Sequence, residues 1–106
     1  MSFETAWEAL REAYRARLPE RLREVEEAWK AWMSGQGGGP ELYRKVHSLN
    51  GSAGTYGYRE LQGLVAELEA LIAPSAREEK PAEIDLRERG EKLLERMRQR
   101  IREGIS

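Results

Sequence analysis

The chain has 106 residues, enough for one domain with a single core. Its 18 basic and 19 acidic residues give a net charge of −1, which argues against a nucleic-acid partner or a polybasic membrane contact. Cysteine is absent, which excludes a disulfide scaffold, a thiolate zinc site and a cysteine nucleophile. Asp85 is the only aspartate, so the chain also lacks the clustered aspartates of a magnesium site.

Membrane and export signals are missing from the sequence. No apolar run approaches the roughly 20 residues needed to span a bilayer. The first ten residues carry acids early and lack the basic start and apolar stretch of a signal peptide. We therefore expect the protein in the cytoplasm.

Apolar residues recur at helical spacing along the chain, in five segments separated by proline and glycine. Ser2 is a candidate N-cap for the first segment, and Pro19 is expected to end or kink that helix and to open the next. The predicted inward residues are, in chain order, Phe3, Trp7, Leu10, Tyr14 and Leu18; Leu22, Val25, Trp29 and Trp32; Leu42, Val46, Leu49 and Ala53; Leu61, Leu64, Leu68, Leu71 and Ile72; and Leu86, Leu93, Leu94, Met97 and Ile101.

The connections are predicted at residues 34–40 (SGQGGGP), 54–57 and 73–81. No segment alternates apolar and polar residues with a period of two, so no strand is expected. The sequence predicts an all-α fold, an antiparallel four-helix bundle with an additional N-terminal helix, forming one domain over residues 1–106.

The only histidine, His47, is predicted to face solvent. At about 100° of rotation per helical residue, it points roughly 130° away from the apolar stripe of its helix. Gly51 and Gly54 lie one and two turns further along nearly the same face, although each glycine inside a helix costs about 0.5–1 kcal/mol relative to alanine. This spacing leaves the imidazole open to a bulky partner. The alternatives are that the glycines admit a neighbouring helix and that His47 is an ordinary surface residue.

Other reactive sites lack the residues they need. A metal site requires several His, Cys or Asp ligands. Ser52 has Asn50 where a hydrolase nucleophile elbow has glycine, and no second histidine exists to build a triad. The glycine-rich loop at residues 34–40 lacks the lysine of a phosphate-binding P-loop.

The segment from His47 to Gly57, read as His-Ser-Leu-Asn-Gly-Ser-Ala-Gly-Thr-Tyr-Gly, closely resembles the signature of histidine phosphotransfer (HPt) domains. The family pattern is His-x-Leu-Lys-Gly, two small residues, Gly-x-x-Gly, and then leucines at helical spacing that end in Leu-Glu. The second part of the pattern is matched by Leu61, Leu64, Leu68 and Glu69. Within the family, the pattern is most similar to the phosphotransfer domain of chemotaxis-type histidine kinases.

The resemblance implies that His47 is phosphorylated and that Glu69, 22 positions later, hydrogen-bonds and orients the imidazole. Helical spacing agrees with this role. The alternative is that Glu69 is an ordinary surface carboxylate. The family usually has lysine where this chain has Asn50, which donates a hydrogen bond but carries no charge. We hypothesise that Arg44, one turn before His47, replaces that charge, so that Asn50 and Arg44 are the candidates for stabilising the phosphoryl group. The alternative for Arg44 is a solvated side chain.

The resemblance also implies a place in a phosphorelay. His47 would accept a phosphoryl group from a histidine kinase or a receiver aspartate and pass it to a response-regulator receiver domain. The chain would then be a covalent carrier and not an enzyme. It would act as a monomer with no cofactor of its own, the magnesium coming from the receiver domain. The expected docking residues are Gly51, Gly54, Tyr43 and Tyr56, of which the tyrosines equally suit half-buried packing. A helical adaptor whose histidine is never phosphorylated is the alternative, and the missing lysine favours it.

Overall fold

The computed structural model describes residues 2–78 and 84–104, and all regular structure in these two ranges is helical. Helix α1 spans Phe3–Met33, α2 spans Gly39–Thr55, α3 spans Arg59–Ile72 and α4 spans Ile84–Glu103. A short 3-10 helix, η1, covers Ala73–Ser75 directly after α3. The predicted all-α class is confirmed.

The prediction of a separate N-terminal helix is wrong, because this segment forms the first part of the continuous helix α1. Ser2 caps α1 as expected, its hydroxyl accepting a hydrogen bond from the Thr5 amide at 3.2 Å. Pro19 lies inside α1 with its ring exposed to solvent. A proline within a helix costs about 3 kcal/mol through its missing amide and a steric clash. Burial of Leu18 and Leu22 on either side opposes that cost and keeps both halves of the helix against the same core.

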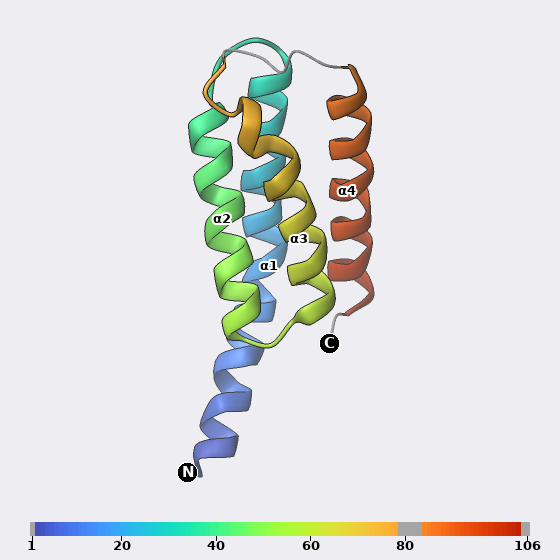
Figure 1. Ribbon diagram of the computed structural model, residues 1–106. Helices are drawn as coiled ribbons and strands as arrows, with labels where there is room; N and C mark the ends of the chain where they lie inside the picture. Colours follow the sequence, from blue (N-terminus) through green and yellow to red (C-terminus); the bar gives the residue numbers. More distant parts are fainter. Residues whose placement is uncertain (1, 79–83, 105–106) are drawn as a thin grey trace.

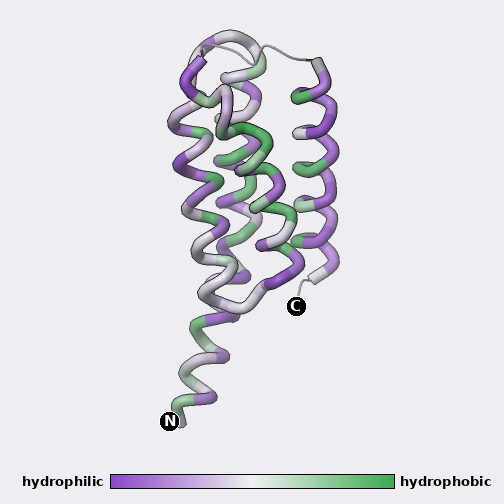
Figure 2. The backbone as a smooth tube through the Cα atoms, viewed as in Figure 1, coloured by the Kyte–Doolittle hydropathy of each residue, from purple (hydrophilic) through white to green (hydrophobic). Residues whose placement is uncertain are grey.

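The four helices pack in a ring, α1 against α2, α2 against α3, α3 against α4 and α4 against α1. In Figure 1 the chain runs up α1, down α2, up α3 and down α4. Hydrophobic positions in Figure 2 recur along each helix between hydrophilic ones, as an amphipathic pattern requires. Because α2 packs against α3, side chains of α3 can reach residues on the solvent-exposed face of α2.

The inward stripes are confirmed for most of the chain. The predicted sets in the second half of α1 and in α2 are all buried, including Trp29 and Trp32. In the later helices, Leu64, Leu71 and Ile101 are only partly buried, and Val65 takes a core position that the pattern did not assign. The other predicted residues of these helices are buried as expected, namely Leu61, Leu68, Ile72, Leu86, Leu93, Leu94 and Met97.

The start of α1 departs from the predicted core. Figure 1 shows α1 extending past the turn between α2 and α3, so its first residues have little to pack against. Phe3 is 83% exposed, Leu10 is 53% exposed, and Trp7 is half-buried, so none of the three belongs to the core. Trp7 stacks on Tyr56 at a centroid distance of 5.6 Å, and Tyr56 stacks on Tyr14 at 4.5 Å. These aromatic contacts hold the protruding helix to the turn.

The first two connections are slightly shorter than predicted. Helix α2 already begins at Gly39, and the preceding Gly35, Gly37 and Gly38 have positive φ angles that favour glycine. Of the predicted connection at 73–81, η1 forms the beginning, and residues 79–81 lie outside the described residues. None of the described helices combines the length and the apolar character that a bilayer crossing needs.

Candidate functional site

The outward face of α2 carries His47 near the middle of the helix. Its neighbours Val46 and Leu49 are buried, whereas the His47 side chain is 68% exposed. Tyr43 and Gly51 lie four residues before and after His47, so all three share one face of the helix. The helical rotation predicted from the sequence therefore agrees with the structure.

Glu69 reaches this face from α3. Its Oε2 atom lies 3.0 Å from Nδ1 of His47, and its Oε1 atom accepts a hydrogen bond of 3.0 Å from Nδ2 of Asn50. The Tyr43 hydroxyl donates a longer bond of 3.4 Å to Oε2. The Glu69 side chain is only 18% exposed. The largely buried carboxylate of Glu69 is thus held by three side chains of α2. Tyr43, His47, Asn50 and Glu69 together form the carboxylate cluster.

Burial and hydrogen bonds shift the pKa of Glu69 in opposite directions. Burial by itself raises the pKa of this carboxyl group, but the bonds from Asn50, His47 and Tyr43 outweigh burial and leave its pKa below the ordinary value of 4.5. Glu69 is therefore ionised at neutral pH. An ionised carboxylate only accepts hydrogen bonds, so Nδ1 of His47 carries the proton that lies between them.

The ring of Tyr43 covers one side of the imidazole. The two ring centroids are 5.9 Å apart and the planes differ by 12°, which is a stacked arrangement. Tyr43 is half-buried, and its hydroxyl and its ring both contact groups of the site. The sequence suggested Tyr43 only as a docking or packing residue, since spacing alone did not reveal a contact with Glu69.

The two glycines differ in what surrounds them. A methyl group added at Gly51 would meet no atom within 4 Å, so the surface next to His47 is open there. At Gly54 an added methyl carbon would lie 2.5 Å from Nε2 of Gln62, a side chain of α3. The nearest atoms at Gly54 thus belong to the flexible end of a side chain of α3, whereas Gly51 faces open space on the face of α2 that carries His47.

Basic side chains lie on the other flank of α2. Arg44 is exposed and lines a shallow groove together with Arg21 and Lys45. Arg21, which the sequence did not single out, reaches from α1 and donates hydrogen bonds to the hydroxyls of Ser48 at 3.0 Å and Ser52 at 2.9 Å. This places positive charge beside the residue that follows His47, while Arg44 makes no hydrogen bond to Glu69 within the described chain.

Tyr56, the other predicted docking tyrosine, lies at the end of α2. It is half-buried between Trp7 and Tyr14, and its carbonyl accepts a 2.7 Å hydrogen bond from Nε of Arg11. These contacts match the packing alternative. The structure does not bring Tyr56 into the carboxylate cluster around Glu69.

The arrangement leaves the two nitrogens of the imidazole in different environments. Nδ1 is bound to Glu69, whereas Nε2 makes no hydrogen bond to any of the described residues. An imidazole with a proton on Nδ1 has its lone pair on Nε2, and a neutral imidazole is a competent nucleophile near pH 7. The site therefore presents a nucleophilic nitrogen whose opposite side is anchored by a carboxylate.

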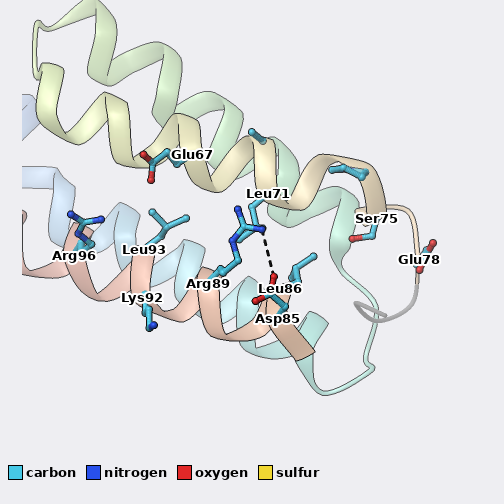
Figure 3. Close-up of a pocket in the computed structure, with 12 residues that line it drawn as sticks. Glu67, Leu71, Ser75, Glu78, Asp85, Leu86, Arg89, Lys92, Leu93 and Arg96 are labelled. Atoms are coloured by element: carbon cyan, nitrogen blue, oxygen red, sulfur yellow. Dashed lines mark ion pairs between the residues drawn. The ribbon is translucent and has the colours of Figure 1, made fainter. Parts of the chain in front are cut away.

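A large groove among the described residues lies elsewhere. It has a volume of about 920 Å³ and runs between α3 and α4, where Leu71 and Leu93 form apolar walls and Arg89 pairs with Asp85 at 3.7 Å (Figure 3). Neither His47 nor its partners line it. Over residues 2–78 and 84–104, no three His, Cys, Asp or Glu side chains gather in a way that would hold a metal ion. The reactive chemistry of the described chain is thus centred on α2.

Comparison with known families agrees with this location. The family model described as "Hpt domain" matches residues 9–104, which is nearly the whole chain and includes all four side chains of the carboxylate cluster. No curated protein and no solved structure matches the chain significantly.

Proposed function

The chain belongs to the Hpt domain family, whose members carry phosphoryl groups in phosphorelays, and we propose that His47 is the residue that carries the phosphoryl group here. The observation that supports this assignment is the contact between Nδ1 of His47 and Oε2 of Glu69 at 3.0 Å. It leaves Nε2 unbound on a side chain that is 68% exposed. A bulky protein donor could therefore reach it.

The proposed step is a direct transfer to nitrogen. The lone pair of Nε2 attacks the phosphorus of a donor phosphohistidine or aspartyl phosphate, a P–N bond forms, and the donor's own P–N or P–O bond breaks with its electron pair leaving on the donor. The Nδ1 proton stays on the imidazole, so the ring becomes cationic. The Glu69 carboxylate, which faces that proton, offsets the new charge. Onward transfer to a receiver aspartate reverses these roles.

The partners are proposed on the same chemical grounds. Hpt domains interact with histidine kinases and response-regulator receiver domains. ATP binding and the magnesium ion are expected from those partners, because the described chain offers a nucleophile and an orienting carboxylate but only Asp85 as an aspartate. One chain supplies every side chain of the site, so we propose that the monomer is the functional unit.

Arg44 is proposed to stabilise the transferred phosphoryl group. It is exposed one turn before His47, and the family's usual lysine is replaced by Asn50, whose amide is bonded to Glu69. We expect Arg44→Ala to slow phosphoryl transfer and Arg44→Lys to retain most of the rate, because a mobile cation suffices to meet phosphate charge. A transfer rate in Arg44→Ala equal to that of the wild type would reject this role.

Phosphoryl labelling tests the proposed function directly. The purified chain is incubated with labelled phospho-receiver domains and, separately, with histidine kinases and ATP, and compared with His47→Gln. We expect a label that is labile in acid and stable in alkali on the wild type and no label on His47→Gln. Label that persists on His47→Gln would reject His47 as the carrier. Absence of label from the wild type with every donor would favour the non-phosphorylated adaptor.

A further inference from the structure

Tyr43 combines two contacts that no other side chain of the site combines. Its ring stacks on the imidazole of His47, and its hydroxyl donates to Oε2 of Glu69, the oxygen that faces Nδ1. The spacing of four residues on α2 makes the stacking a direct consequence of helical geometry. At 3.4 Å the hydroxyl bond is the longest of the three to Glu69 and is therefore the weakest of them.

The imidazole needs such a support because the rest of its surroundings are open. Its side chain is 68% exposed, and the position one turn further along the helix, Gly51, has no side chain to confine it. The terminal torsion of a histidine is broad and roughly two-fold, and a half-turn of the ring exchanges Nδ1 with Cδ2 and Nε2 with Cε1, so that a carbon would face Glu69. A single hydrogen bond to Glu69 leaves that rotation available whenever the bond opens.

We propose that Tyr43 is a positioning residue for phosphoryl transfer, its ring holding the imidazole of His47 in the plane that directs Nδ1 toward Glu69 and Nε2 toward the partner. This inference rests on the proposed function of His47. In the transfer step, Tyr43 neither gains nor loses a bond. It limits the rotation of the nucleophile while Nε2 forms the P–N bond and Nδ1 keeps its proton. Gly51, one turn further along α2, has no side chain that would crowd the approaching donor.

Two substitutions separate the ring from the hydroxyl. Tyr43→Phe keeps the stacked ring, and we expect its phosphorylation rate to stay within about twofold of the wild type. Tyr43→Leu keeps an apolar side chain but removes the flat ring, and we expect its rate to fall on the order of tenfold, as loss of a near-attack orientation predicts. Equal rates for wild type and Tyr43→Leu would overturn the proposal, as would an equally large loss in Tyr43→Phe.

A measurement on the unphosphorylated protein keeps this test independent of the donor. Nitrogen-15 NMR of the single imidazole reports which ring nitrogen carries the proton. We expect one Nδ1–H form in the wild type and in Tyr43→Phe, and a mixture of the two neutral forms in Tyr43→Leu. An unchanged spectrum in Tyr43→Leu would overturn the positioning role. If the wild type accepts no phosphoryl group, the proposed function fails while the spectra still decide whether Tyr43 positions the ring.

A double substitution excludes a general loss of structure. If Tyr43 acts by directing Nδ1 to Glu69, its removal should matter less once Glu69→Gln has weakened that contact. We expect Tyr43→Leu to slow phosphorylation clearly less in the Glu69→Gln background than in the wild type. The same fold-loss in both backgrounds would identify Tyr43 as a packing residue and overturn the proposal.

Discussion

Asn50 holds the carboxylate oxygen of Glu69 that His47 does not use, through a hydrogen bond of 3.0 Å from Nδ2 to Oε1. Each oxygen of the carboxylate thus has its own donor from α2, and rotation of the carboxylate would break a bond. This bond uses one of the two N–H groups of the Asn50 amide. In this structure Asn50 therefore helps to fix the orientation of the Glu69 carboxylate.

We predict that Asn50→Ala slows phosphorylation of His47 by about fivefold, since a hydrogen bond to a partly exposed charged group contributes about 1 kcal/mol. Asn50→Asp should slow it more, because a second carboxylate raises the pKa of Glu69 and repels its charged form. The initial rate of labelling from a phospho-receiver domain measures both effects. A rate in Asn50→Asp at or above that of Asn50→Ala would contradict this explanation.

The lowered pKa of Glu69 gives the fold a specific dependence on acid. Burial raises this pKa, but the donors Asn50, His47 and Tyr43 reverse the shift and leave it below 4.5. The ionised carboxylate therefore stabilises the folded state above pH 4.5, and this contribution is lost as the pH falls through the lowered value. We predict that Glu69→Gln flattens the decline of the unfolding free energy below pH 4.5, as measured by urea unfolding at a series of pH values. Parallel curves for the two proteins would contradict this.

Gly51 and Gly63 form a matched pair for testing the open surface beside His47. Both lie in helices, and a methyl group added at either would meet nothing within 4 Å. We predict that Gly51→Ala and Gly63→Ala each stabilise the fold by about 0.5–1 kcal/mol, because alanine favours the helix. Only Gly51→Ala should slow transfer to and from protein partners, since only Gly51 adjoins the imidazole. Thermal unfolding and partner transfer rates measure the two effects, and equal transfer rates in both variants would show that bare backbone at Gly51 is not required.

The helical period explains what could be predicted from the sequence. Residues of α2 separated by three or four positions must share a face, so the burial of Val46 and the exposure of His47 follow from spacing alone. The same reasoning failed at the start of α1, where Phe3 and Leu10 continue the apolar stripe but extend beyond the other helices. Periodicity gives the direction of a side chain and not whether another helix reaches it.

The site shows the same limit. Helical spacing agrees with a contact between Glu69 and the imidazole, but the contacts of Tyr43 and Asn50 depend on side-chain rotamers that spacing does not determine. The prediction that Pro19 ends one helix and opens the next was wrong, because a proline inside a helix is tolerated where the residues that flank it are buried in the same core. In each case a tertiary contact outweighed a local preference.

Gly90 is a structural glycine that no sequence pattern indicated. It is buried in α4, and a methyl carbon added there would lie 1.9 Å from Cη2 of Trp29. The indole of Trp29 also packs edge-on against Trp32, with ring centroids 6.1 Å apart. Trp32 therefore confines the indole in addition to Gly90. The absence of a side chain at Gly90 is what lets α4 approach α1.

We predict that Gly90→Ala destabilises the fold by about 1–3 kcal/mol, because overpacking of the core outweighs the better helix propensity of alanine. Urea unfolding measures the loss, and Gly63→Ala provides the control, since the same change at an open helical position should stabilise. Below its unfolding transition, Gly90→Ala should still accept phosphoryl groups at His47, because the site lies on α2 and α3. Stability equal to or above that of the wild type would show that Trp29 can turn aside, and that the close approach of α1 and α4 does not depend on this glycine.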